Sequence, residues 1–271
     1  MNAQAYGLND VVLVGICSDA NSSHMRGAAA APAAIREVLH NGASNLWSET
    51  GVDIGGHPGF HDVGDLHVGD TVEEFLGIEG HIAGIVGCGA LPLVLGGDHA
   101  ITYPVLRAVY AARGPLNVLH FDAHPDLYHD YEGNPYSHAS PFARALEDGL
   151  VGRLVQVGIR TLSAHLREQA TRFGVEIHEM KDFDAASFST DFNGPVFISL
   201  DLDAFDPAFA PGVSHHEPGG LSVREVLGII QGLPNPIIGA DIVELNPARD
   251  INGMTAAVAA KLVKEIAGKM L

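Results

Sequence analysis

Short apolar runs alternate with segments of helical periodicity along most of this chain. Apolar runs bounded by glycine, proline or polar residues are typical of buried strands, whereas a 3.6-residue period is typical of helices packed on a sheet. The pattern predicts strands at Val11–Ile16, Leu91–Leu95, Asn117–Phe121, Leu154–Gly158, Val196–Leu202 and Ile237–Val243. It predicts helices at Pro32–Leu39, Thr102–Ala112, Phe142–Glu147, Val223–Gln231 and Thr255–Lys269. This alternation indicates an α/β fold with a parallel sheet covered by helices on both faces. The glycine- and histidine-rich segment Asn41–Asp70 has no assignable pattern.

Length and composition favour one domain. The chain has 271 residues, 46% of them hydrophobic, which is enough for one large core. Its 32 glycines are spread along the chain without forming a linker-like block. We therefore expect a single domain over residues 1–271.

Charge and cysteine content restrict the partners and the compartment. A formal net charge of −18 argues against nucleic acid or an anionic membrane as partner and is compatible with a small cationic substrate. The two cysteines, Cys17 and Cys88, form no C-x-x-C motif, which argues against a disulfide framework. The apolar run Val11–Ile16 is too short to span a bilayer and follows an acidic residue, so no secretory signal is evident. We expect a cytoplasmic location.

Polar residues follow four of the predicted strands at the point where each strand ends. These segments are Gly96–His99, Asp122–Asp126, Asp201–Asp203 and Glu244–Pro247. In open α/β sheets, ligands bind outside the carboxyl ends of the strands. The sequence therefore predicts one shared crevice at this edge of the sheet.

Asp122, His124 and Asp126 occupy alternate positions directly after a strand. In an extended chain alternate side chains point to the same face, so these three side chains would converge on one site. Packing does not explain them, because burial of unpaired acids and imidazoles is costly. Asp98, which precedes His99, is expected to orient a neighbouring ligand.

The residue types at these strand ends indicate a metal centre with more than one ion. The candidate ligands are two imidazoles and four carboxylates, without a thiolate: His99, Asp122, His124, Asp126, Asp201 and Asp203. Oxygen ligands with some imidazole fit Mn²⁺ better than a structural zinc site, and Zn²⁺, Fe²⁺ and Co²⁺ stay open. Six ligands exceed the need of one ion that keeps an open position. Two ions about 3.5–4 Å apart explain the surplus and can lower the pKa of a bridging water.

Several motifs resemble those of the ureohydrolase (arginase/agmatinase) family, and most of all the plant-type arginases. The stretches that carry the resemblance are GGDHA, HFDAHPD, YSHASPFARA, SLDLDAFDPAFAPGVSHHEPGGLS and GADIVELNPARD. They cover the chain from about Gly96 onward, and MRGAAAAP and HDVGDL extend a looser match before it. The resemblance implies a three-layer α/β/α sandwich with a mostly parallel central sheet. It also implies two Mn²⁺ ions per subunit and hydrolysis of a guanidinium group to urea and an amine.

The resemblance also implies roles for individual residues. One Mn²⁺ would be bound by His99, Asp122, Asp126 and Asp201, and the other by His124, Asp122, Asp201 and Asp203. Asp122 and Asp201 would then bridge the ions.

Three residues are assigned to catalysis. Glu244 matches the carboxylate that holds the guanidinium, a strong and directional pairing. His138 matches a loop histidine that shuttles protons, a task suited to a pKa near neutrality. Asp126, one of the candidate metal ligands, is also assigned as catalytic.

The substrate tail is the open point of this interpretation. The segment Glu132–Ser140 resembles the plant arginase loop, in which Asn134 and Ser137 would bind the tail, and this favours L-arginine. Tyr128 stands where animal arginases have an asparagine, and Glu217–Gly220 also resembles agmatinases, so agmatine or another guanidino compound stays open.

Two other classes of protein also stay open. A non-catalytic metal-binding protein would retain the fold without the activity, and a metal-dependent deacetylase would use a related fold. The intact ligand set argues against the first, and the Glu-x-Asn-Pro motif argues against the second. The family resemblance further implies a homotrimer or homohexamer.

Overall fold

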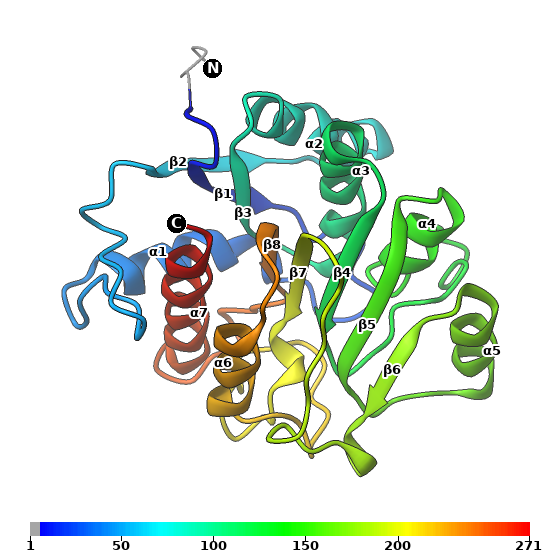
Figure 1. Ribbon diagram of the computed structural model, residues 1–271. Coiled ribbons are helices and arrows are strands. Elements are labelled where there is room, and N and C mark those ends of the chain that lie inside the picture. Colours follow the sequence, from blue (N-terminus) through cyan, green and yellow to red (C-terminus); the bar gives the residue numbers. More distant parts are fainter. Residues whose placement is uncertain (1–5) are drawn as a thin grey trace.

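Residues 6–271 fold around one parallel sheet of eight strands in the order β2-β1-β3-β8-β7-β4-β5-β6 (Figure 1). The computed structural model describes residues 6–271, and the first five residues of the expected 1–271 domain lie outside the described part. The strands are β1 Val11–Cys17, β2 Phe60–His67, β3 Leu91–Leu95, β4 Leu116–Phe121, β5 Val151–Ile159, β6 Glu176–Glu179, β7 Val196–Asp201 and β8 Ile237–Val243.

Helices cover both faces of the sheet and complete three layers (Figure 1). The helices on one face are α1 Ala31–His40, α6 Val223–Gly232 and α7 Met254–Met270. The helices on the other face are α2 Val72–Val86, α3 Thr102–Arg113, α4 Pro141–Glu147 and α5 Ala164–Phe173. Short 3₁₀ helices are found at Ala28–Ala30, His99–Ile101, Met180–Asp182 and Leu202–Ala204. The predicted three-layer α/β/α fold is confirmed.

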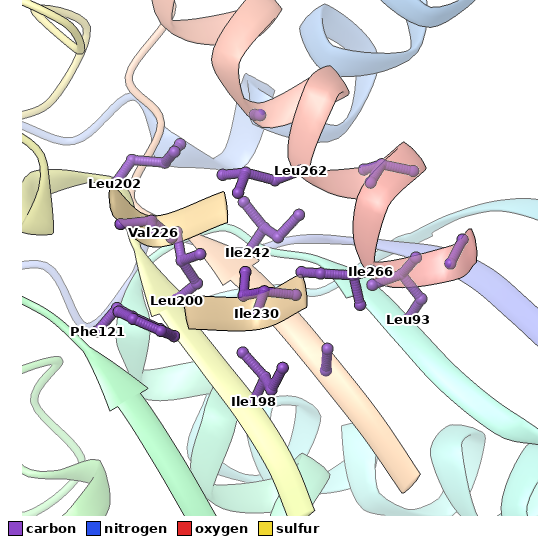
Figure 2. Close-up of a cluster of buried hydrophobic side chains, with 14 of the residues drawn as sticks. Leu93, Phe121, Ile198, Leu200, Leu202, Val226, Ile230, Ile242, Leu262 and Ile266 are labelled. Carbon is purple, nitrogen blue, oxygen red and sulfur yellow. The ribbon is translucent and has the colours of Figure 1, made fainter. Parts of the chain in front are cut away.

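The central strands are buried on both faces. Figure 2 shows one of the two cores, in which Leu200 of β7 and Ile242 of β8 cluster with Ile230 of α6 and Ile266 of α7. All four side chains have no solvent exposure, and burial of each contributes about 1.5–3 kcal/mol. This packing holds β3, β8, β7 and β4 side by side, so their carboxyl ends form one continuous edge.

The segment without an assignable pattern contains an edge strand and an ordered loop. Strand β2 lies within it, and the loop before β2 is held against helix α7. Lys264 of α7 donates to the Ser44 hydroxyl at 2.9 Å and to the Asn45 carbonyl at 3.0 Å.

The elements α2, α5 and β6 were also not predicted from the sequence. Within residues 6–271 no helix is both long and apolar enough to cross a membrane.

Gly97 allows the turn after β3 to pass very close to the end of β1. A Cβ atom at position 97 would lie 1.6 Å from the Ser18 carbonyl oxygen.

We expect Gly97→Ala to lower the free energy of unfolding by about 1–3 kcal/mol or more, measured by urea denaturation. Gly77→Ala is the matched control, because a Cβ there meets open space within α2 and should stabilise the helix by about 0.5–1 kcal/mol. Equal effects of the two substitutions would contradict this account.

Candidate metal centre

The four strands whose ends carry acids or histidines are consecutive neighbours in the sheet, in the order β3-β8-β7-β4. His99 begins the 3₁₀ helix after β3, and Glu244 directly follows β8. Asp201 is the last residue of β7, and Asp203 lies in the 3₁₀ helix that follows. The segment Asp122–Asp126 follows β4. The predicted shared crevice therefore exists at the carboxyl edge of the sheet.

A turn, not an extended strand, brings Asp122, His124 and Asp126 together. Strand β4 ends at Phe121, so the alternation predicted from the sequence is not the geometry found. The Asp122 carboxylate accepts a hydrogen bond from the His124 backbone N–H at 2.6 Å, which folds the chain back on itself. Asp126 has a φ of 50°, the left-handed region that non-glycine residues rarely adopt.

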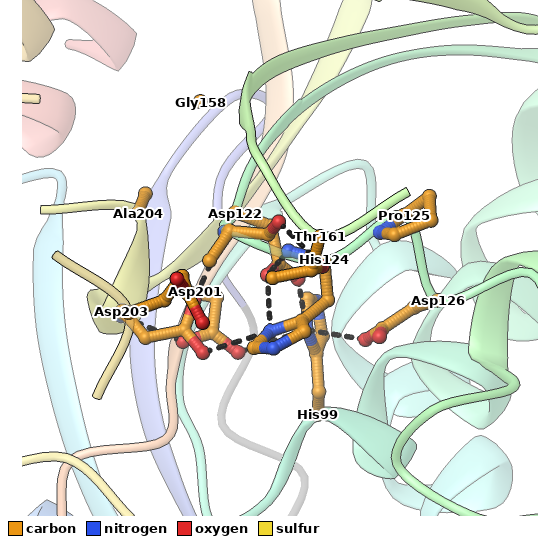
Figure 3. A network of polar contacts seen from close by, with 12 residues as sticks. His99, Asp122, His124, Pro125, Asp126, Gly158, Thr161, Asp201, Asp203 and Ala204 are labelled. Carbon is orange, nitrogen blue, oxygen red and sulfur yellow. Dashed lines mark hydrogen bonds and ion pairs between the residues drawn. The ribbon is translucent and has the colours of Figure 1, made fainter. Parts of the chain in front are cut away.

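Three carboxylates surround one nitrogen of His99 (Figure 3). Its Nδ1 atom lies 3.2 Å from Asp122 Oδ2, 3.0 Å from Asp126 Oδ2 and 3.2 Å from Asp201 Oδ2. Burial opposes protonation of this imidazole, but hydrogen bonds with the three carboxylates outweigh burial and raise the pKa of His99 well above its usual range. The cluster thus attracts a positive charge to this point.

A chain of hydroxyl groups orients the His99 ring from behind. The His99 Nε2 atom lies 3.0 Å from the Ser199 hydroxyl, which donates to Asp241 at 2.7 Å. Thr102 donates to the other oxygen of Asp241 at 2.9 Å. Because Ser199 gives its proton to Asp241, its oxygen accepts from Nε2–H of His99, so in the neutral ring Nδ1 carries the lone pair. A lone pair facing three carboxylate oxygens is repelled unless a cation lies between them, so these residues fit a metal ion.

A second set of ligands shares Asp122 with the first. His124 Nδ1 lies 3.0 Å from Asp203 Oδ2 and 3.4 Å from Asp122 Oδ1. Burial and the neighbouring Asp122 carboxylate raise the pKa of Asp203 to about 6. The backbone N–H of Ala123 donates to Asp203 at 3.0 Å, and the backbone N–H of Asp203 donates to Asp201 at 2.8 Å. All six candidate ligands are therefore brought together in two groups joined at Asp122.

His120 orients Asp122 and was not among the residues assigned from the sequence. Its Nε2 atom lies 2.9 Å from Asp122 Oδ2, and its Nδ1 atom lies 2.9 Å from the amide nitrogen of Gln156. An amide nitrogen only donates, so Nδ1 accepts and Nε2–H donates to the carboxylate. His120 is thus a hydrogen-bond donor to a ligand and not a ligand itself. His120 lies in the HFDAHPD motif, two residues before Asp122, and this position could have indicated from the sequence that it contacts the candidate ligand.

Glu244 and His138 form a buried pair beside the ligand cluster. Glu244 Oε1 accepts from the His99 backbone N–H at 2.9 Å and lies 2.8 Å from His138 Nδ1. Burial opposes protonation of His138, but the Glu244 carboxylate outweighs burial and raises the pKa of His138 to about 9. Glu244 has a φ of 67°, so its backbone, like that of Asp126, is held in a strained conformation.

A cavity of about 230 Å³ opens above these groups. Its lining includes four of the candidate ligands together with His138 and Glu244, and no Arg or Lys is among the described residues that line it. Ser23 and His215 also line it, and neither was assigned from the sequence.

The residues assigned to the substrate tail do not line the cavity. Asn134 donates to the Asn21 side chain at 3.0 Å. Ser137 is buried, and its hydroxyl accepts from the Ala139 backbone N–H at 3.3 Å. Both residues therefore support the loop that carries His138.

The sequence suggested that Asp98 orients a neighbouring ligand, but in the structure Asp98 contacts the loop after β1 instead. Its Oδ2 atom accepts from the Asn21 backbone N–H at 3.0 Å and from the Ser22 hydroxyl at 3.3 Å. Burial and the nearby Glu244 carboxylate raise the pKa of Asp98 to about 7. Asp98 thus anchors the loop after β1 to the end of β3.

A sheet edge that gathers imidazoles and carboxylates around a cation-attracting point is typical of metal-dependent enzymes, hydrolases among them. Comparison with known proteins narrows this class, because the family model described as Arginase family matches residues 9–268. Arginase 1, mitochondrial, of Arabidopsis thaliana is 46% identical over 275 residues, covering 95% of this chain and 80% of that protein. Arginase, mitochondrial, of Medicago truncatula is 44% identical over 276 residues, covering 95% and 81%. The solved structure of arginase from Medicago truncatula has a TM-score of 0.91 and 44% sequence identity, covering 98% of this chain and 88% of that one.

The chain belongs to the arginase family and is a metal-dependent ureohydrolase that acts on C–N bonds. The resemblance found in the sequence is therefore confirmed. The expected cytoplasmic location is wrong, because both plant relatives are named mitochondrial. Free cysteines indicate only a reducing environment, which does not distinguish the cytosol from the interior of an organelle.

The hydroxyl chain behind His99 generates a prediction about metal affinity. We expect Ser199→Ala to weaken metal binding by about 10- to 100-fold, because the ring loses the acceptor that keeps its Nδ1 lone pair directed at the ion. Titration against a competing chelator measures the change. The matched control is Ser140→Ala, since Ser140 is buried and its hydroxyl has no hydrogen-bond partner within residues 6–271. Equal affinity of the Ser199 variant and the wild type would refute the orienting role.

Proposed function

We propose that this chain hydrolyses the guanidinium group of L-arginine to L-ornithine and urea. The observation that carries the proposal is the Glu244 carboxylate, held beside the metal-ligand cluster at the wall of a small cavity. A guanidinium is a planar cation that pairs with a carboxylate through two parallel hydrogen bonds. The plant arginases at 44–46% identity support arginine as the substrate.

Two Mn²⁺ ions per subunit are the proposed cofactors. His99, Asp122, Asp126 and Asp201 would hold one ion, and His124, Asp122, Asp201 and Asp203 the other. The contacts of Asp122 with both histidines support a bridging role for this carboxylate. When bound, the ions would supply an activated water nucleophile and stabilise the negative charge that develops during attack.

The remaining groups bind the substrate and move protons. Glu244 would orient the guanidinium so that its central carbon faces the metal-ligand cluster. No Arg or Lys is among the described residues that line the cavity, so neither residue type competes with the guanidinium for Glu244. His138, with its pKa raised to about 9, holds a proton at neutral pH and would deliver it to the leaving amine.

The tail of the substrate distinguishes arginine from agmatine, which lacks the carboxylate. Asn134 and Ser137 would act on the tail through the loop they support. Direct contacts would come from polar cavity residues outside the set of candidate ligands, among them Tyr128, Tyr131 and Thr161. Agmatine and other guanidino compounds are the alternative substrates.

Two further expectations from the sequence stay predictions. They are a single domain over residues 1–271 and assembly as a homotrimer or homohexamer.

A substrate comparison tests the proposed function. With added Mn²⁺, we expect urea release from arginine at a higher kcat/KM than from agmatine or guanidinobutyrate. A colorimetric urea assay measures the three rates, and Glu244→Gln is the control for guanidinium binding. A preference for agmatine would replace the proposed substrate, and absence of urea from all three compounds would refute the proposed activity.

The raised pKa of His138 generates a prediction about pH. The protonated ring is the proton donor, and the raised pKa keeps it protonated up to about pH 9. We expect kcat/KM, which reports the free enzyme, to fall as the pH rises through about 9. In His138→Asn this limb should disappear, and kcat at neutral pH should be about 10²-fold lower. A pH limb that stays the same in the variant belongs to another group and would contradict the donor role.

A further inference from the structure

We propose that Ser23 is a positioning residue that holds the His138 imidazole in its catalytic orientation. This inference rests on the proposed function, because it concerns the histidine that would protonate the leaving amine. Ser23 lies in the loop after β1, which the sequence interpretation left without a role. Its side chain lines the same cavity as His138 and Glu244.

The His138 ring is held at both nitrogens by different partners. Its Nδ1 atom lies 2.8 Å from Glu244 Oε1, and its Nε2 atom lies 2.8 Å from the Ser23 hydroxyl. The Ser23 backbone N–H also donates to Nε2, at 3.2 Å. When the ring is neutral, Nε2 accepts from the Ser23 backbone N–H, so the ring proton is on Nδ1 and is donated to Glu244.

A serine hydroxyl suits a histidine that changes its protonation state. When the ring is neutral, the hydroxyl donates to Nε2. When the ring is protonated, the same oxygen accepts from Nε2–H. Ser23 therefore offers a hydrogen bond to His138 both before and after the ring releases its proton. Alanine at this position would leave only the backbone N–H, which the protonated ring repels.

Substrate binding increases the importance of this contact. Glu244 is the proposed partner of the guanidinium, and it is also the partner of His138 Nδ1. As the substrate engages Glu244, the carboxylate divides its acceptor capacity between two cations. The Ser23 hydroxyl contacts Nε2, the ring nitrogen that Glu244 does not contact, so pairing of Glu244 with the guanidinium does not itself remove the Ser23 hydrogen bond.

The loop that carries Ser23 is fixed to the loop that carries His138. The Asn21 carbonyl accepts from the His138 backbone N–H at 3.1 Å, and the Asn21 side chain accepts from Asn134 at 3.0 Å. The Asn21 backbone N–H is bound in turn by the buried Asp98. Ser23 and His138 therefore meet in a prearranged geometry, which keeps the cost of orienting the ring low.

The experiment compares four forms of the Mn²⁺-loaded enzyme: wild type, Ser23→Ala, Ser23→Thr and Ser22→Ala. Ser22 is the matched control, because it lies in the same turn and its hydroxyl points to Asp98. One readout is the kinetics of urea release from arginine, together with the bound Mn²⁺ content. The other is the rate at which diethyl pyrocarbonate modifies His138, followed by peptide mass spectrometry, which requires no turnover.

We expect Ser23→Ala to lower kcat by about 10- to 100-fold with little change in KM or Mn²⁺ content. His138 of this variant should react faster with diethyl pyrocarbonate, because Nε2 has lost its hydroxyl partner. Ser23→Thr retains a hydroxyl and should restore most of kcat, and Ser22→Ala should match the wild type in both readouts.

The two readouts separate the inference from the proposed function. Wild-type kcat and an unchanged modification rate in Ser23→Ala would overturn the positioning role. An equal loss in Ser22→Ala would overturn it as well, because it would assign the effect to the fold of the turn. If the wild type releases no urea, the proposed function fails, and the modification rates alone decide whether Ser23 holds His138.

Discussion

Four aspartates and two histidines gather at the carboxyl edge of the sheet, and the repulsion among the four carboxylates is the constraint on which the site depends. One nitrogen of His99 lies 3.0–3.2 Å from three carboxylates. Such an arrangement persists only if a cation balances it, because isolated buried carboxylates are costly. A bound metal ion would therefore also stabilise the fold, since it binds the native state and not the unfolded chain. The hydroxyl chain behind His99 and the His120–Asp122 bond aim these ligands at the cation.

The fold meets this constraint by placing rigid elements below the site and irregular backbone within it. The strands beneath are fully buried and interlocked with helices on both faces. Most of the candidate ligands lie in the turns and 3₁₀ helices that follow the strands, and two residues after strand ends, Asp126 and Glu244, adopt positive φ values. Strain of this kind costs about 1–3 kcal/mol per residue and is retained where the surrounding packing enforces it. Here it directs one carboxylate to the metal-ligand cluster and another to the cavity.

The catalytic loop gains its order from the amino-terminal part of the chain. The buried Asp98 fixes the Asn21 backbone N–H, and Asn21 in turn fixes the His138 loop. This arrangement explains why Asn134, which resembles a substrate-binding residue, contacts another loop instead of the cavity. Groups that recognise the substrate and groups that hold the loops can thus share one motif, and only their contacts separate the two roles.

The sequence by itself determined the class of fold, six of the eight strands and the identity of all six candidate ligands. Those inferences rest on local periodicity and residue chemistry, which are properties of neighbouring positions. Local pattern did not reveal β2, a polar edge strand, or α2, whose three glycines weaken its helical signal. Only the tertiary structure decided that β3, β8, β7 and β4 are adjacent, which nitrogen of each histidine faces a ligand, and that Ser23 meets His138 across 115 positions. Such contacts depend on the order in which strands enter the sheet, and no local pattern encodes that order.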